Sequence, residues 1–395
     1  MYQRQLFPYF IGFLLVFGTG IKIGDLLVRF DLIFLCLYTL FQGTYIFQHR
    51  KLFWKAFFLF FACFVSIVSS KFIIGHEILS RDFVILPQIV SYLLCWMGID
   101  SLRRNDSLKN LKWSLLFFIL LSGFIGIMQS SNLLGINESW ITKIYLSDDL
   151  FNKFEIGLDF SSLDRVVGVF GDPRRFGFIL AFASVYFLHF TLTLKNFKIV
   201  RLLTFIIVTY ALILTQSRTA FLSYSLITTV YLLIYQKKIL FFLILCVLSY
   251  FNFTDFDRSE SRLFNDESSS FNASQGARKR DNLEYFISIK SSPAIVFFGL
   301  GPSKRYLPGH EHSEVGFWLI RFGAVGFLFY IYFMSQLLRD SIRSFSKSNP
   351  FSILPILVFV VFLVFLFAES IFKDSQIVLM LIILASPEPD KLNHV

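Results

Sequence analysis

The sequence predicts an all-α polytopic membrane protein with about 12 transmembrane helices and two large loops on one face. Apolar side chains make up 55% of the 395 residues and charged side chains only 16%, whereas a soluble protein carries about 25% charged residues. The apolar residues form solid runs close to the length of about 20 that a bilayer-spanning helix needs. Because these runs do not alternate polar and apolar residues, an outer-membrane barrel is excluded.

The apolar runs and the charges between them define the expected spans and their orientation. Lys and Arg are roughly three times as frequent in the segments on the side of the N-terminus as in the short loops opposite. This asymmetry predicts that both termini are cytoplasmic. The predicted spans cover residues 7–23, 30–47, 53–70, 82–99, 111–130, 176–194, 199–216, 219–235, 238–254, 315–337, 350–368 and 374–387.

Two loops are much longer than the other connections, and the predicted orientation puts both outside the cytoplasm. Loops above about 15 residues are usually functional or disordered. Residues 277–290 carry an apolar stripe beneath Arg278, Lys279 and Arg280, typical of a helix on the membrane surface or, equally, of a solvated basic helix end. The expected organisation is helices one to five in 1–130, a loop in 131–175, helices six to nine in 176–254, a loop in 255–314, and helices ten to twelve with a cytoplasmic tail in 315–395.

The net charge and the cysteines exclude several partners. A charge of +10 would indicate nucleic acid in a soluble protein, but here the cytoplasmic loops account for it, and we expect no nucleic-acid partner. All four cysteines lie in apolar runs, which argues against a disulfide scaffold or a thiolate metal site.

The first candidate motif, residues 165–177, ends the first large loop. Gly168, Gly171 and Pro173 predict a tight turn into a helix, and Arg165, Arg174 and Arg175 surround that turn. A helix N-terminus attracts anions, and the planar guanidinium can hold two phosphate oxygens. The alternative is that these arginines only extend toward lipid headgroups.

The second motif, residues 215–219, joins two predicted spans by a very short connection. Arg218 is therefore expected at or just within the membrane, where a charge needs a partner or a water-filled cavity. An anionic ligand would supply that partner, and an acidic loop residue is the alternative.

The third motif ends the second large loop. Gly299 and Gly301 precede His310-Glu311-His312-Ser313-Glu314, and Gly323 and Gly326 follow on the next span. A histidine at a membrane boundary can accept a proton near neutral pH. His310 and His312 also suggest a metal site, but no cysteine or third histidine lies nearby, and we expect no metal.

The three motifs, in this order, resemble those of the O-antigen polymerase and O-antigen ligase family of bacterial envelope enzymes. The resemblance covers the chain from about Arg165 to Gly326, and Ser313 departs from the Asn that the family often has after the histidine. The matching residues are Arg165, Gly168, Phe170 and Pro173 in the first motif, Ser217, Arg218 and Thr219 in the second, and Gly299, Gly301, His312, Gly323 and Gly326 in the third.

The resemblance implies an inner-membrane glycosyltransferase, with its active site facing the periplasm, that acts on an undecaprenyl-pyrophosphate-linked oligosaccharide. Arginines can neutralise the charge that a divalent metal usually neutralises, and the sequence has no carboxylate pair typical of a metal-dependent glycosyltransferase, so we expect no metal and no cofactor. A polymerase transfers this glycan to another lipid-linked repeat unit and a ligase transfers it to lipid A core; the weakly matching N-terminal half favours the polymerase. A chain-length regulator protein is an expected partner. The expected pyrophosphate-binding residues are Arg165 and Arg218, followed by Arg174, Arg175 and Arg280, and the expected base is His312, with Glu314 and His310 as alternatives.

A flippase for the same lipid-linked sugars is the competing class. A transporter places its charges near the bilayer midplane in broken helices. Apart from Arg29 and Arg321, the charges of interest here cluster at the outer boundary beside long loops, which favours the enzyme.

Overall fold

The computed structural model describes residues 2–18, 20–23, 26–41, 50–75, 77–78, 80–105, 107–138, 166–193, 198–236, 293–302, 313–343, 355, 358–360, 362–364, 372 and 374–386. The predicted span at 238–254, most of the one at 350–368 and the expected surface helix at 277–290 lie outside these residues.

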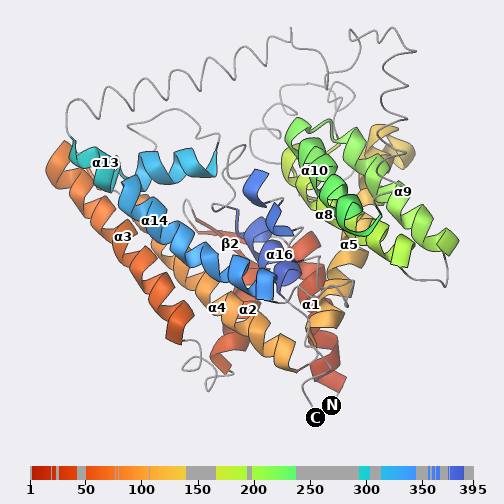
Figure 1. Cartoon of the computed structure of the whole chain (residues 1–395), viewed down its shortest axis with the longest axis horizontal. Helices are drawn as coiled ribbons and strands as arrows, with labels where there is room; N and C mark the ends of the chain where they lie inside the picture. The colour runs from red at the N-terminus through yellow and green to blue at the C-terminus, as the bar shows by residue number, and fades with distance from the viewer. Residues whose placement is uncertain are drawn as a thin grey trace, which may run out of the picture. The chain divides into compact units, whose positions relative to one another are not determined.

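The described chain is almost entirely helical (Figure 1). Among the described residues, five helices are long and apolar enough to cross a membrane, which indicates a membrane-embedded protein. The full count of twelve spans stays a prediction. The five are α3 (Arg50–Ile74), α4 (Ile85–Arg104), α5 (Leu108–Ser130), α8 (Pro173–Thr193) and α14 (Glu314–Arg343).

The remaining helices are shorter, and most coincide with predicted spans. The apolar ones are α1 (Tyr2–Phe17), α2 (Phe30–Phe41), α9 (Lys198–Leu214), α10 (Arg218–Tyr235) and α16 (Ser375–Ala385). A five-residue helix, α13 (Ala294–Phe298), and two 3-10 turns, η2 (Ser80–Val84) and η3 (Leu133–Glu138), lie in the connections.

The chain forms two compact units, and their boundary falls inside α5. Unit 1 comprises Met1–Leu115 and Ala273–Val395, and unit 2 comprises Leu116–Asn272. The first unit therefore contains α1 to α4, α13, α14 and α16. The second contains most of α5 together with α8, α9 and α10.

Unit 1 is built on α4, which packs against α2, α3 and α16, while α3 also packs along α14 (Figure 1). The sequence of α16 is apolar on all sides, and every residue from Gln376 to Ala385 is buried. A helix without a polar face belongs in the interior of a bundle. The α2–α4 contact is close because Gly98 leaves room for Thr39, whose hydroxyl donates to the carbonyl of Leu94 at 2.8 Å.

Unit 2 is built on α8, which packs against both α9 and α10. Its small residues Ala181, Ala183 and Ser184 are fully buried. Small side chains allow helix backbones to approach closely in membrane proteins. The central position of α8 fixes where its N-terminus, and therefore the first motif, lies relative to the neighbouring helices.

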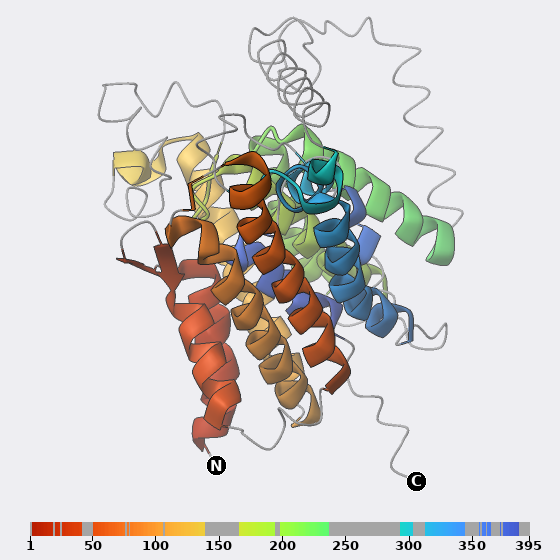
Figure 2. The same cartoon turned by 90° about the vertical axis from the view of Figure 1, so that its left-hand side faces the viewer.

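The all-α class is confirmed for the described residues, apart from one short β-hairpin, and the predicted first span, 7–23, extends beyond the end of its helix. Helix α1 ends at Phe17, and the N–H of Gly18 donates to the carbonyl of Leu14 at 2.7 Å to close it. Strands β1 (Gly20–Ile23) and β2 (Leu26–Arg29) then pair antiparallel, as Figure 2 shows beside α1 and α2. Glycines at 18 and 20 and β-branched residues after them favour a strand over continued helix.

Candidate functional site

The first and second motifs meet in unit 2. The backbone N–H of Val166 donates to the carbonyl of Leu214, the last residue of α9, at 3.3 Å. A Cβ placed on Gly177 would lie 2.8 Å from Thr215 Oγ1 and 2.9 Å from Ala220 Cβ. The turn before α8 and the turn before α10 are therefore in direct contact, although about 40 residues separate them in the sequence.

The turn of the first motif is held by a glutamine at the end of α5. The side-chain Oε1 of Gln129 accepts from the N–H groups of Val167 at 3.2 Å and of Gly168 at 2.9 Å. Its Nε2 donates to the carbonyl of Gly168 at 3.2 Å. Gly168 has φ +55°, and a Cβ there would lie 2.7 Å from the ring of Phe176. Only glycine fits this position, and one buried side chain satisfies the irregular backbone around it.

Asp172 caps the N-terminus of α8. Its Oδ1 accepts from the N–H groups of Arg174 at 2.7 Å and of Arg175 at 3.3 Å. The Arg174 guanidinium forms an ion pair with Asp172, with Nη2 3.1 Å from Oδ2. Burial raises the pKa of Asp172, but the charge and hydrogen bonds of Arg174 outweigh burial and lower the pKa below its ordinary value. The Asp172 carboxylate thus neutralises the charge of Arg174, one of the two exposed arginines at this helix start.

The second motif caps α10 in a similar way. The hydroxyl of Ser217 accepts from the N–H of Ala220 at 3.4 Å, and Thr215 Oγ1 accepts from the N–H of Ser217 at 3.3 Å. Gln216 adopts a left-handed φ of +47° between them. Arg218 is the first residue of α10. The short turn therefore places a cationic residue directly at a helix N-terminus.

The contact between these two turns brings two helix N-termini together. Each N-terminus carries a partial positive charge and backbone N–H groups that favour an anion. Arg174 and Arg175 lie in the first turn of α8, and Arg218 lies in the first turn of α10. Arg165 directly precedes Val166, the residue bonded to the end of α9, and itself lies outside the described residues. The sequence-based expectation of an anion site is therefore attached to this end of unit 2.

The glycine segment of the third motif, Gly299 to Gly301, lies in unit 1 against a break in α14. Gly323 has φ +65° and ψ −171°, so α14 consists of two helices separated by a kink. The kink leaves two carbonyls without helical partners: Ile320 O accepts from Leu300 N–H at 2.8 Å and Arg321 O from Gly301 N–H at 2.9 Å. Satisfying these carbonyls matters because unpaired backbone groups are costly inside a membrane protein.

Glu314 begins α14 and is fully buried. Its Oε1 accepts from the indole N–H of Trp318 at 2.8 Å, and its Oε2 accepts from the backbone N–H of Phe372 at 3.1 Å. Tyr330 stacks on Trp318 with 4.5 Å between ring centroids. Both carboxylate oxygens thus bind groups that hold α14 in place, which favours a packing role for Glu314 over that of a general base.

The other expected site residues divide into two groups. Arg174 and Arg175 are described with their side chains, and Arg218 is described by its backbone. The contacts above bring these three to one end of unit 2. Arg165, Arg280, His310 and His312 lie outside the described residues. Among the residues that are described, no group of three or more His, Cys, Asp or Glu side chains could hold a metal ion.

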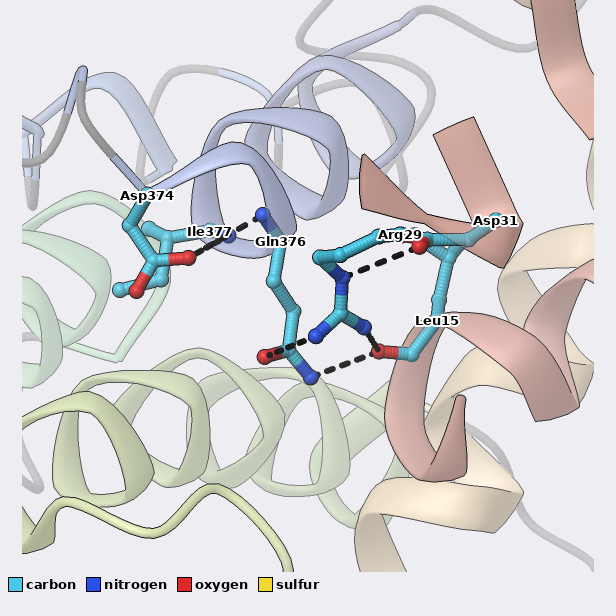
Figure 3. A network of polar contacts seen from close by, with 6 residues as sticks. All are labelled: Leu15, Arg29, Asp31, Asp374, Gln376 and Ile377. Atoms are coloured by element: carbon cyan, nitrogen blue, oxygen red, sulfur yellow. Dashed lines mark hydrogen bonds and ion pairs between the residues drawn. The ribbon is translucent and has the colours of Figure 1, made fainter. Parts of the chain in front are cut away.

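Sequence reasoning missed Gln129 and a buried polar network in unit 1. In Figure 3, Arg29 Nε donates to Asp31 Oδ1 at 3.0 Å, and its Nη1 donates to Gln376 Oε1 at 3.3 Å. Gln376 Nε2 and Arg29 Nη2 both donate to the carbonyl of Leu15, at 2.7 Å and 3.4 Å. The sequence did contain a signal for both, because polar and charged side chains are rare in apolar segments. Asp31 interrupts one apolar segment, and Gln129 lies at the end of another.

Comparison with known proteins adds no assignment: no protein-family model matches the chain, and no curated protein matches it.

Proposed function

We propose that this protein is a membrane glycan polymerase of the O-antigen polymerase type. It transfers an undecaprenyl-pyrophosphate-linked glycan to a sugar hydroxyl of another lipid-linked repeat unit, at the periplasmic face of the inner membrane. The observation that carries the proposal is the contact of the turns before α8 and α10, which gathers two helix N-termini and Arg174, Arg175 and Arg218 at one end of unit 2.

The leaving group explains why a cationic site suits this reaction. The bond between the anomeric carbon and the pyrophosphate oxygen breaks, and the bonding electrons leave with the pyrophosphate, whose negative charge grows. Fixed donors aimed at such charge are worth roughly 3–4 kcal/mol each in a dry site. Arg165 and Arg218 are the first candidates, whereas the Arg174 guanidinium already forms an ion pair with Asp172. Arg175 and Arg280 are further candidates.

The acceptor hydroxyl loses a proton as its oxygen bonds to the anomeric carbon. In the proposal, the imidazole of His312 takes that proton, which histidine can do near neutral pH. His310 is the alternative base. Glu314 is the weaker alternative, because its two oxygens already accept hydrogen bonds from Trp318 and Phe372.

The proposal includes no metal, because the arginines take the charge-neutralising part that a divalent cation often has in glycosyl transfer. Purified enzyme should therefore keep its activity in excess EDTA. Loss of activity with EDTA, and recovery on adding Mg²⁺ or Mn²⁺, would contradict this part.

The competing function is a flippase for the same lipid-linked sugar, and one observation favours it. Asp31 is fully buried, is paired with Arg29 and has an Oδ2 that accepts no hydrogen bond from the part of the chain that the structure describes. Ionisable groups inside a membrane often lie on substrate or proton pathways. The polymerase remains the better proposal, because three of the cationic residues gather beside helix N-termini rather than inside the helical bundle.

Deletion of the gene distinguishes these functions. A polymerase mutant should carry single repeat units on its lipid A core, because ligation continues without polymerisation. A ligase or flippase mutant should carry none. A direct test incubates the full-length protein in proteoliposomes with purified lipid-linked repeat units. Polymer ladders are expected, and their absence with active, correctly oriented protein would contradict the proposal.

A further inference from the structure

An apolar groove lies between α3 and α14 in unit 1. It has a volume of about 550 Å³, and its walls are aromatic and aliphatic. The lining residues are Phe58, Val325, Leu328, Phe329 and Tyr332. Exposed fractions of 65% for Leu328 and 45% for Tyr332 show that the groove opens outward from the helix pair. Its size and composition suit a hydrocarbon chain.

The contacts between α3 and α14 define which helix ends lie together. Phe58 stacks on Phe329 with 5.6 Å between ring centroids. Earlier in α3, Lys55 Nζ donates to Ser335 Oγ at 2.7 Å, and later in α3, Ser66 donates to the carbonyl of Arg321 at 3.1 Å. As the residue numbers increase along α3, the residue numbers of their partners in α14 decrease, so the two helices are antiparallel. The start of α3 and the end of α14 lie at the same end of the groove.

That end of the groove is basic on both helices. Lys51 precedes the groove residue Phe58 by seven positions, and Arg339 follows the groove residue Tyr332 by seven positions. Seven residues are two helical turns, so each cation lies on the same face as the groove and about 10 Å beyond it. Both side chains are exposed. The distribution of charges predicts that both lie at the cytoplasmic face.

An aromatic residue lies between the basic end and the groove. Trp54 is exposed, lies between Lys51 and Phe58 on the same helical face, and has its ring 6.0 Å from that of Phe58. Trp side chains concentrate at the boundary between headgroups and hydrocarbon. The order along α3 is thus cation, interfacial aromatic, apolar groove, which is the order of phosphate, glycerol backbone and acyl chain in a phospholipid.

Lys55 is a buried cation that contacts Tyr332, one of the residues that line the groove. It is 2% exposed, and its ammonium lies 4.6 Å from the centre of the Tyr332 ring. The bond to Ser335 and the contact with Tyr332 fix both the lysine and the groove wall.

We propose that this groove is a binding site for one glycerophospholipid with an anionic headgroup, such as phosphatidylglycerol. One acyl chain lies along Phe58, Leu328 and Tyr332, and Lys51 and Arg339 bind the headgroup phosphate. Basic residues at the end of an interhelical pocket are typical of sites for acidic lipids. The inference goes beyond the proposed enzymatic function and does not depend on it.

Native mass spectrometry of the purified full-length protein tests this site. The protein is titrated with phosphatidylglycerol or with phosphatidylcholine of the same acyl chains. We expect at least one phosphatidylglycerol to bind about 25-fold more tightly than phosphatidylcholine, since each of the two basic residues near the lipid surface contributes roughly fivefold. The K51Q/R339Q protein should lose this preference. The control K109Q/K198Q removes two exposed cations at the starts of α5 and α9 and should keep it.

A second variant tests the acyl chain separately from the headgroup. Leu328→Trp adds bulk at the mouth of the groove and should weaken both lipids at the tight site. Equal affinities of the wild type for the two lipids, or an unchanged preference in K51Q/R339Q, would overturn the proposal. Displacement of the lipid by inorganic phosphate would show a site for a soluble anion, and preferential displacement by a polyprenyl phosphate would show an isoprenoid site; either result also overturns it.

Discussion

Gln129 and Gly168 are joined by two hydrogen bonds that run in opposite directions. Gln129 Oε1 accepts from the Gly168 N–H at 2.9 Å, and Gln129 Nε2 donates to the Gly168 carbonyl at 3.2 Å. One buried side chain therefore replaces the partners that regular secondary structure would give to this turn. This turn, which precedes α8, positions the N-terminus of α8 beside that of α10. The stability of the candidate anion site should depend on this pair.

Replacing Gln129 with Leu tests that dependence. The change removes the acceptor for two buried N–H groups and the donor to one carbonyl, and an unsatisfied buried group costs about 1–3 kcal/mol. We expect a clear fall in the unfolding temperature of the detergent-solubilised protein and loss of polymer formation. Ser130→Ala is the control, because its exposed hydroxyl bonds only to a carbonyl of its own helix, Ile127 O. A Gln129→Leu protein as stable as this control would refute the role of Gln129.

Gly177 tests the contact between the two turns. A Cβ there would come within 2.8 Å of Thr215 Oγ1 and 2.9 Å of Ala220 Cβ, so Gly177→Ala forces the turns apart. Overpacking of this kind costs roughly 1–3 kcal/mol. Gly123→Ala is the matched control in α5, since its nearest neighbours would be 3.8 Å away. Gly177→Ala should lower both the unfolding temperature and the polymerisation activity, whereas Gly123→Ala should change neither. If the two variants change these quantities equally, the contact between the turns is not critical.

The lowered pKa of Asp172 predicts that its contribution to the stability of the protein depends on pH. Its pKa is lowered in the folded protein, so its contribution to stability is complete above the ordinary value of 3.8 and is lost as the pH falls through the lower folded value. Asp172→Asn should be less stable than the wild type at pH 7, by less than about 1 kcal/mol, because the pair is partly exposed. The difference should shrink below about pH 4. Unfolding temperatures measured across this range check the prediction, and a difference that grows in acid would contradict it.

Replacing Arg218 with lysine should lower the polymerisation rate more than replacing Arg174 with lysine. Lysine keeps the charge but cannot form the two parallel hydrogen bonds of a guanidinium with a phosphate. Arg218→Lys should lower the polymerisation rate by roughly a hundredfold. Arg174→Lys should lower it by less than about tenfold, because the Arg174 guanidinium is already paired with Asp172. Equal rates for the wild type and Arg218→Lys would show that the site needs only a point charge.

Substitutions of Glu314 and His312 should cause different defects: the first in stability, the second in activity. In Glu314→Gln, one of the two N–H donors from Trp318 and Phe372 faces an amide N–H₂, which should destabilise the fold by about 1–3 kcal/mol. The folded fraction should still polymerise within a few fold of the wild type. His312→Ala should lower activity by roughly a hundredfold or more without changing stability. A stable but inactive Glu314→Gln protein would instead identify Glu314 as the base.

The sequence was a good guide to the helices and a weaker one to the connections. The apolar runs predicted α3, α4, α5, α8 and α14 to within a few residues, because a helix that meets lipid must be apolar over its whole length. The same criterion extended the first span through Gly18 to residue 23, because hydropathy cannot tell an apolar strand from the last turn of a helix. The kink at Gly323 was also invisible to hydropathy, since both halves of α14 are apolar.

What the sequence alone determined is the helical, membrane-embedded class of the protein, whereas the chemistry of its motifs stays a prediction. Composition requires helices in a membrane, and arginine beside glycine at helix starts indicates anion binding. What only the tertiary structure decided is which motifs share a site and which side chains are already engaged. Gly177 lies against Ala220 because α8 and α10 pack together, and Glu314 is occupied because Phe372, 58 residues later, reaches it. Such contacts depend on the packing of distant segments, which no local pattern records.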